Sequence, residues 1–219
     1  MFLGGIDEAG RGSIFGPLVI AGVSFGSQKI AELKDMDIRD SKKITSKKRV
    51  FLYEKILKIC ESIFICKINC NTIDKFVKIN KLNYLESKFM TIIAENLNAK
   101  KIIIDSCDVN PDRFKEEIKK NLIDKRKCIY SFHKADIDNI IVSSASIIAK
   151  VTRDNEILKI KSIIGKDIGS GYPSDPKTRL FLITENNIEN YQKHIRFSWR
   201  PVKQILNNNY QKKLFCYKI

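Results

Sequence analysis

Residues 3–25 read LGGIDEAGRGSIFGPLVIAGVSF, and this stretch decides the fold class. Its first part, Leu3–Asp7, is short and apolar and ends in carboxylates, whereas Pro17–Phe25 is a longer apolar run. The intervening segment, Gly10–Gly16, is rich in glycine, which permits a tight backbone turn. The pattern predicts two adjacent strands joined by a short connection.

Helical and strand-like patterns alternate along the rest of the chain. The spacing of apolar residues predicts helices over Lys47–Glu61, Leu82–Leu97 and Ser143–Ile164, a helix that begins at Pro111, and shorter helices over Lys177–Ile188 and Arg200–Asn208. Strands are expected over Ser62–Cys70, Lys101–Asp105 and, at an edge of the sheet, Cys128–Phe132. This order predicts one mixed-sheet α/β domain over residues 1–175, with a small C-terminal helical extension over 176–219 packed on it.

Acidic residues stand where strands are expected to end. Asp7 and Glu8 close the first strand, Asp105 closes the apolar run KIII, and Asp136 precedes the long helix. Adjacent strand residues point to opposite faces, so Asp7 and Glu8 can share a site only if the backbone turns at once, which the following glycines permit. Each acid alone is also explained as a helix cap or a solvated turn residue. Together they indicate a site for Mg²⁺ or Mn²⁺, because these hard cations prefer oxygen ligands.

The strand that ends at Asp105 differs from the others in its pattern. Four of its five residues form the run KIII, in which apolar residues do not alternate with polar ones. Such a continuous run is typical of a strand that is covered on both faces.

The charge balance points to an anionic partner. Lysine and arginine number 40 and aspartate and glutamate 25, which leaves a net charge of +15. Nucleic acid is the first candidate for the partner of such a basic chain, although a Lys-, Ile- and Asn-rich composition can also reflect an AT-biased genome. A basic protein that gathers acids in one pocket suffers from their mutual repulsion unless cations lie between them, and this arrangement is used in phosphodiester hydrolysis.

The remaining composition favours a protein that works inside the cell, in the cytoplasm. Apolar residues make up 43% of the chain, and no apolar run is long enough to span a bilayer. The N-terminus lacks the basic and apolar regions of a targeting signal. The six cysteines form no CxxC pair, so we expect buried thiols in a reducing compartment and no zinc site.

Six segments together resemble the ribonuclease HII family, in its archaeal and eukaryotic branch. They are, in order, GIDEAGRGSIFGPLVIAGV, DSKKIT, IIIDSCDVNPDRF, HKADIDNIIVSSASIIAKVTRD, GSGYPSDPKT and RFSWRPV, and they extend over nearly the whole chain. The resemblance implies a ribonuclease H-like fold and metal-dependent cleavage of the RNA strand of RNA/DNA hybrids. It also implies nicking of duplex DNA on the 5′ side of embedded ribonucleotides, with 5′-phosphate and 3′-hydroxyl ends, in ribonucleotide excision repair and DNA replication.

By motif position, the resemblance assigns the metal ligands to Asp7, Glu8, Asp105 and Asp136. The two-metal mechanism that it implies uses Mg²⁺ or Mn²⁺. The family usually has proline after GRG, where this chain has Ser13. The loss of a rigid φ angle there is expected to loosen the turn slightly.

The resemblance also implies which residues contact the substrate. Gly10, Arg11, Gly12 and Tyr172 would read the 2′-hydroxyl at the RNA–DNA junction, and Lys42 and Lys43 would contact phosphates. From the spacing itself, Ser146, Lys150 and Arg153 recur at i, i+4 and i+7 opposite an apolar stripe, which predicts an open polar helix face for phosphates. The expected partners are RNA/DNA hybrids and ribonucleotide-containing duplex DNA, and we expect no membrane contact and a monomer that acts without accessory subunits.

Two other functions fit parts of the sequence. A recombinase or Holliday-junction resolvase can share the fold and the carboxylates but does not read a 2′-hydroxyl, so cleavage of an all-DNA junction would favour it. A basic RNA-binding protein without catalytic activity would not require the four acids. The segment GGIDEAGRG also lacks the Lys-Ser/Thr ending of a nucleotide-binding P-loop.

Overall fold

The computed structural model of the chain describes residues 1–36, 38, 44–185, 187–205 and 207. The chain divides into two compact units. The first comprises Met1–Ala9, Val19–Lys67 and Leu82–Thr152, and the second comprises Gly10–Leu18, Ile68–Lys81 and Arg153–Ile219. Each unit has a hydrophobic core of its own. The domain boundary expected between residues 175 and 176 stays a prediction.

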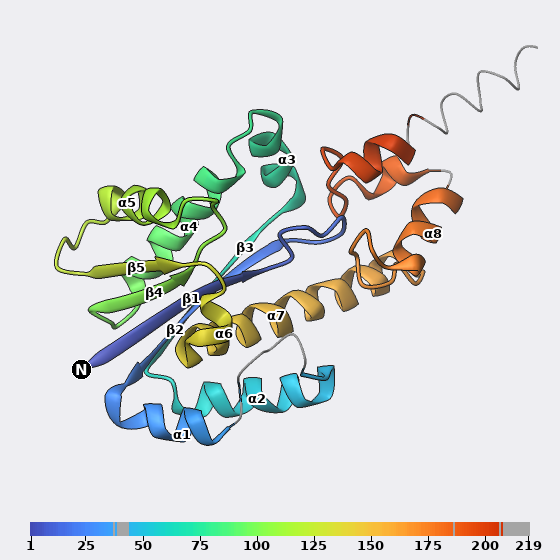
Figure 1. Cartoon of the computed structure of the whole chain (residues 1–219). Coiled ribbons are helices and arrows are strands. Elements are labelled where there is room, and N and C mark those ends of the chain that lie inside the picture. The colour runs from blue at the N-terminus through green and yellow to red at the C-terminus, as the bar shows by residue number, and fades with distance from the viewer. Residues whose placement is uncertain (37, 39–43, 186, 206, 208–219) are drawn as a thin grey trace, which may run out of the picture. The chain divides into compact units, whose positions relative to one another are not determined.

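A five-stranded mixed sheet forms the centre of the first unit (Figure 1). Its strands are β1 (Phe2–Ala9), β2 (Leu18–Gly26), β3 (Ser62–Ile68), β4 (Lys101–Asp105) and β5 (Cys128–Phe132). The strand order is β3-β2-β1-β4-β5, with β1 antiparallel to β2 and parallel to β4, and β4 parallel to β5. The predicted mixed sheet is therefore confirmed, and β5 is the edge strand that its sequence indicated.

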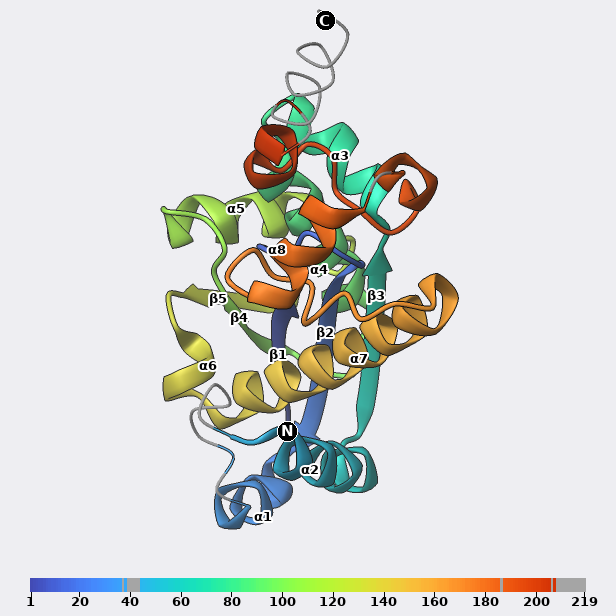
Figure 2. The same cartoon turned by 90° about the vertical axis from the view of Figure 1, so that its right-hand side faces the viewer.

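Helices cover both faces of this sheet. They are α1 (Ile30–Asp35), α2 (Ser46–Ile59), α4 (Leu82–Asn96), α5 (Pro111–Asn121), α6 (Ala135–Asp138) and α7 (Ile140–Ile164, of which residues 140–152 belong to the first unit). The two views place α1, α2 and the start of α7 on one face and α4 and α5 on the other (Figures 1 and 2). Side-chain caps begin two of the helices: Thr45 accepts a hydrogen bond from the Lys48 amide, and Asn110 accepts one from the Arg113 amide.

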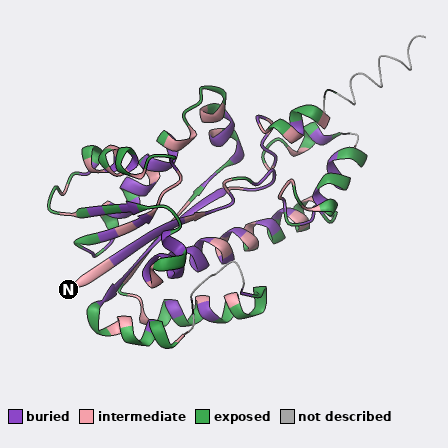
Figure 3. Ribbon diagram, viewed as in Figure 1, coloured by how far each residue is buried: buried purple, intermediate pink, exposed green. Residues whose placement is uncertain are grey.

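Two glycines let helices approach the sheet closely. A Cβ atom on Gly5 would lie 2.7 Å from the main-chain carbon and oxygen of Ile141 in α7. On the opposite face, a Cβ atom on Gly22 would collide with the Ile93 side chain in α4. The strands β1 and β2 are accordingly almost wholly buried between the two helical layers (Figure 3). No helix in the described part of the chain is long and apolar enough to span a membrane.

The second unit is built around a separate apolar cluster. Its elements are α3 (Cys70–Lys78), residues 153–164 of α7, α8 (Pro176–Thr184), a 3-10 turn over Ile188–Tyr191 and a helical stretch over residues 200–205. Phe15 and Phe181 meet edge to face with ring centroids 5.5 Å apart. Asp74 in α3 accepts hydrogen bonds from the amides of Phe197 and Ser198, which fixes the segment after the 3-10 turn.

Several elements differ from the predicted ones. The helices α1, α3 and α6 were not predicted, and the strand expected over Ser62–Cys70 ends at Ile68. The strand ends early because the Asn69 side chain accepts a hydrogen bond from the Thr72 amide and so begins α3. In addition, α8 ends at Thr184 instead of Ile188, and α7 begins at Ile140 instead of Ser143.

We predict that Gly5→Ala destabilises the protein by about 1–3 kcal/mol, because the new methyl group must push the α7 backbone away from the sheet. Urea unfolding of the two proteins measures the difference. Gly12→Ala is the matched control, since no atom lies within 4 Å of the Cβ that it adds. An unfolding free energy equal to that of the wild type would contradict the close contact between β1 and α7.

Candidate active site

The sheet register places Asp7 and Asp105 side by side. Ile6 pairs with Ile104 across the parallel strands β1 and β4, so the next residues, Asp7 and Asp105, stand at the same level. Neighbouring strands lie about 4.8 Å apart, and residues at matching positions point to the same face. That face is the one covered by α7, because Gly5, two residues before Asp7, contacts Ile141. The predicted meeting of these two acids is therefore present.

Burial and like charge make Asp7 an unusual carboxyl group. Asp7 is 4% exposed, and burial raises its pKa to about 7, with a further contribution from the charge of Asp105. A hydrogen bond from Ser146, the charge of Lys150 and the Glu8 amide, which donates to Asp7 Oδ1 at 2.7 Å, act in the opposite direction. Since the pKa stays high, these groups do not fully compensate the buried negative charge.

Asp136 is connected to the same strand end through its neighbour in the chain. The Ala135 amide donates to Asp105 Oδ1 at 2.8 Å, which attaches the start of α6 to the end of β4. Asp136 follows directly and is 3% exposed. The Ser143 hydroxyl donates to the main-chain oxygen of Asp136 and thereby fixes the short connection between α6 and α7.

The Glu8 side chain starts on the face of the sheet opposite to that of Asp7. Strand β1 stays paired with β2 beyond Asp7, with Glu8 opposite Ile20 and Ala9 opposite Val19. Adjacent residues of a paired strand point to opposite faces, so the Glu8 side chain starts on the face away from Asp7. The immediate turn that a shared site was expected to require is absent, because main-chain pairing continues to Ala9 and the positive φ angle of +85° comes at Gly10.

The donor atoms of this site suit a hard divalent cation, although no complete ligand set is assembled. Among the described residues, no three His, Cys, Asp or Glu side chains lie close enough to hold a metal ion together. The pair formed by the buried Asp7 and the half-buried Asp105 nevertheless offers oxygen atoms alone, and the two carboxyl groups repel each other. Oxygen ligands of this kind fit Mg²⁺ or Mn²⁺ better than zinc.

The polar face expected on α7 is not open to solvent. Ser146 is fully buried, Arg153 is 3% exposed and Lys150 is half-buried, with its Nζ donating to Ser146 Oγ at 2.7 Å. The expectation of an open face was wrong. Ser146 and Lys150 face Asp7 on the sheet, and the Arg153 guanidinium donates hydrogen bonds to other groups of the protein. Lys42 and Lys43 lie outside the described residues.

The glycine turn belongs to the second unit and is held by a buried arginine. The Ser13 amide donates to the Gly10 oxygen at 3.2 Å and closes the turn. Arg196 is fully buried, and its guanidinium donates to the main-chain oxygens of Arg11, at 2.9 Å, and Gly16, at 3.0 Å. The role of Arg196 was not predicted. The motif RFSWR indicated that this segment belongs to the family pattern. The carbonyl groups to which Arg196 donates follow only from the tertiary structure.

Tyr172 lies against a second buried arginine of the same unit. The central carbon of the Arg153 guanidinium is 4.3 Å from the centroid of the Tyr172 ring, a cation–π contact. Arg153 also donates to Ser13 Oγ at 2.8 Å and to the Ser170 oxygen at 2.6 Å. Arg153 thus contacts both Tyr172, which the sequence predicts to contact the 2′-hydroxyl, and Ser13, which follows Gly10-Arg11-Gly12. Its guanidinium binds groups of the protein, where a phosphate contact was expected.

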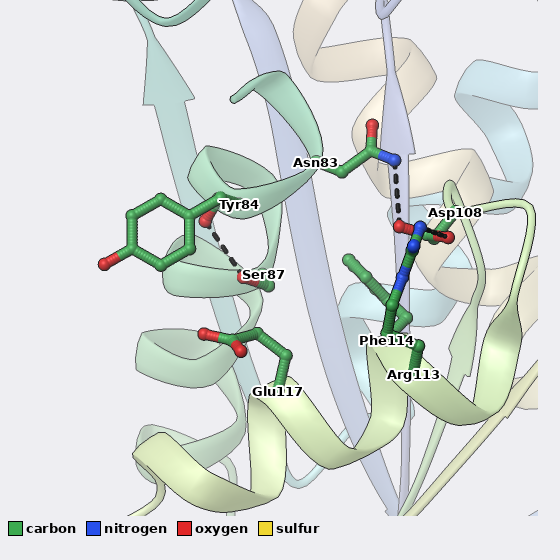
Figure 4. Close-up of a pocket in the computed structure, with 7 residues that line it drawn as sticks. All are labelled: Asn83, Tyr84, Ser87, Asp108, Arg113, Phe114 and Glu117. Carbon is green, nitrogen blue, oxygen red and sulfur yellow. Dashed lines mark hydrogen bonds and ion pairs between the residues drawn. The ribbon is translucent and has the colours of Figure 1, made fainter. Parts of the chain in front are cut away.

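Another acid of the IIIDSCDVNPDRF segment has a structural function. Asp108 borders a cavity of about 160 Å³ between α4 and α5 (Figure 4). Its carboxylate accepts hydrogen bonds from Asn83 at 3.0 Å, from the Asn110 amide at 2.9 Å and from Arg113 at 2.5 Å. These contacts connect the start of α4 with the start of α5. Asp108 therefore stabilises the packing of the two helices.

Comparison with known proteins places the chain in a family. The model of the family Ribonuclease HII matches residues 4–202. A ribonuclease HII of Cenarchaeum symbiosum is 41% identical over 206 residues, which cover 94% of this chain and 98% of that protein. The ribonuclease H2 structure from Pyrococcus horikoshii OT3 is 36% identical, has a TM-score of 0.84, and covers 95% of this chain and 98% of its own.

Two further structures extend the comparison. The ribonuclease HII in a complex with PCNA from Archaeoglobus fulgidus is 34% identical with a TM-score of 0.81, over 91% of this chain and 96% of that one. Bst-RNase HIII in complex with Mn²⁺ is 18% identical with a TM-score of 0.78, over 94% of this chain and 70% of that one, and it shows the shared fold. The expected ribonuclease H-like fold is confirmed, and the chain belongs to the ribonuclease HII family of RNA-cleaving hydrolases.

Proposed function

We propose that this ribonuclease H, besides cleaving the RNA strand of RNA/DNA hybrids, nicks duplex DNA on the 5′ side of an embedded ribonucleotide. Both reactions leave 5′-phosphate and 3′-hydroxyl ends. The observation that carries the hydrolytic part is the pair formed by the buried Asp7 and the half-buried Asp105, in which burial, together with the charge of Asp105, raises the pKa of Asp7 to about 7. Two neighbouring carboxylates of this kind repel each other unless a cation lies between them, which suits a site that binds cations next to a phosphodiester.

Asp7 and Asp105 are the residues proposed to hold the divalent cation, Mg²⁺ or Mn²⁺, with Asp136 as a further ligand. Glu8 is proposed as a fourth ligand that joins them through a rearrangement at the end of β1, because its side chain starts on the opposite face of the strand. A cation bound there lowers the pKa of water and stabilises the negative charge that develops on the leaving oxygen. The protein itself supplies orientation. Hydrogen bonds from Ser146 and the Glu8 amide fix the Asp7 carboxylate, and the Ala135 amide fixes that of Asp105.

Recognition of the ribonucleotide is proposed for the second unit. The 2′-hydroxyl is the group that distinguishes RNA from DNA at one nucleotide. The main-chain groups of Gly10, Arg11 and Gly12 and the side chain of Tyr172 are the proposed readers. Arg196 and Arg153 support this proposal, because their hydrogen bonds hold the turn and the Tyr172 loop in defined positions.

We further propose that the chain acts as a monomer inside the cell, on RNA/DNA hybrids and on ribonucleotide-containing duplex DNA. Its net charge of +15 favours binding to nucleic acid before any sequence or sugar is read. Lys42, Lys43 and Lys150 are the proposed phosphate contacts. Digestion of a hybrid, a duplex with one ribonucleotide and an all-DNA junction in parallel tests the substrate assignment, and cleavage of the all-DNA junction would favour a resolvase instead.

Asp7→Asn and Asp105→Asn should each reduce the cleavage rate at least a hundredfold while substrate affinity changes little, because each removes a proposed cation ligand and no phosphate contact. Single-turnover cleavage and binding titrations measure the two quantities. Asp112→Asn is the control, since this carboxylate is exposed and pairs with Lys115 on α5. Near-wild-type rates in either active-site variant would refute the ligand assignment.

Addition of Mg²⁺ should raise the melting temperature of the wild type by several degrees, because an ion that binds the folded state alone stabilises it. The rise should vanish in Asp7→Asn, whose metal-free form should be at least as stable as the wild type once the repulsion from Asp105 is gone. Thermal melts with Mg²⁺, with chelator and with NaCl of equal ionic strength measure this. An equal rise in both proteins would show that the ion binds elsewhere.

Replacement of Tyr172 should affect a single ribonucleotide more than a continuous hybrid, where other riboses compensate for a poorly read junction. If the ring stacks on the substrate, Tyr172→Phe keeps most of the activity and Tyr172→Ala loses roughly 1–3 kcal/mol of transition-state stabilisation. If the hydroxyl reads the ribose, Tyr172→Phe already fails. Initial rates on both substrates separate these cases, and an unchanged rate for Tyr172→Ala would remove Tyr172 from the readers.

A further inference from the structure

We propose that Ser13 is a positioning residue that holds the Tyr172 loop against the glycine turn and thereby sets the preference for a single embedded ribonucleotide. The proposal rests on the proposed function, because it assigns a cause to the discrimination that the turn and Tyr172 are proposed to make. All of the groups involved belong to the second unit.

The Ser13 hydroxyl joins two segments that are far apart in the sequence. Ser13 is fully buried, and its hydroxyl lies 2.5 Å from the Phe15 oxygen and 3.0 Å from the Gly171 oxygen, to which it can donate. The Gly171 oxygen also accepts from the amides of Ile14, at 2.7 Å, and Phe15, at 3.2 Å. The segment that follows the glycine turn and the residue before Tyr172 are thus attached to each other through these groups.

The same hydroxyl orients the Arg153 side chain. Arg153 donates to Ser13 Oγ at 2.8 Å and to the Ser170 oxygen at 2.6 Å, while its guanidinium lies against the Tyr172 ring. A Cβ atom on Gly171 would lie 2.9 Å from the Arg153 guanidinium, and one on Gly10 would lie 3.3 Å from the Arg153 Cγ. Arg153 therefore fills the space between the turn and the loop, and Ser13 supplies one of its acceptors.

Removal of the hydroxyl leaves a buried charged donor with one acceptor fewer. Hydrogen bonds to charged groups contribute more than neutral ones, and their loss lets the guanidinium change its position. The Tyr172 ring, which contacts that guanidinium, would lose its defined position relative to Gly10-Arg11-Gly12. The reading of an isolated ribonucleotide depends on this geometry, whereas the acids of the first unit do not involve Ser13.

The decisive variant is Ser13→Ala, assayed on a duplex with one ribonucleotide and on a continuous hybrid under single-turnover conditions. We expect the rate on the single ribonucleotide to fall about tenfold and the rate on the hybrid to fall no more than about threefold. Ser13→Thr keeps a hydroxyl group at the same position and should restore the wild-type ratio of the two rates. In the Tyr172→Ala background, Ser13→Ala should change that ratio no further, because the two residues act through one geometry.

The matched control is Ser198→Ala, which removes another buried serine hydroxyl of the second unit, one that donates to Asp74. It should lower the melting temperature without changing the ratio of rates. A wild-type ratio in a folded Ser13→Ala protein would overturn the proposal, and so would an equal loss on both substrates. If the wild type itself fails to cleave at a single ribonucleotide, the proposed function is wrong, and this outcome is distinct from failure of the Ser13 variants alone.

Discussion

The repulsion between Asp7 and Asp105 is the constraint on which the active site depends. The parallel register of β1 and β4 places the two side chains next to each other, because matching positions on neighbouring strands point to one face. Burial under α7 then strengthens the repulsion and raises the pKa of Asp7 to about 7. The close approach of α7 is possible because Gly5 has no side chain at the point of contact.

In the second unit, two buried arginines determine how the loops are arranged. Arg196 holds the main-chain oxygens around the glycine turn, and Arg153 holds Ser13, the Ser170 oxygen and the Tyr172 ring. A guanidinium carries five N–H donors in a rigid plane, so one side chain can fix several loop groups together. In the second unit, Arg153 and Arg196 therefore hold loops of the protein itself in position.

The main elements could be predicted because their signals are local. The glycine-rich turn, the helix-period patterns and the strand-end acids each depend on neighbouring residues, and the mixed sheet and the edge position of β5 agree with them. The prediction for the run KIII in β4 was only partly correct, since its continuous apolar residues indicated a strand that is buried on both faces. Ile102 and Ile104 are fully buried, but Ile103, which points to the opposite face of the sheet, is only half-buried, so that face is not fully covered at this position.

By itself the sequence determined the family and the fold class and singled out the four acids as candidate ligands, because these inferences depend on residue type, order and local spacing. The tertiary structure alone decided which of those residues meet. It paired Asp7 with Asp105, directed Glu8 to the other face and buried the Arg153 face of α7. The physical reason is that strand register and helix packing are long-range properties: a period of 3.6 residues shows which side chains share a helix face, but not whether solvent or another segment covers that face.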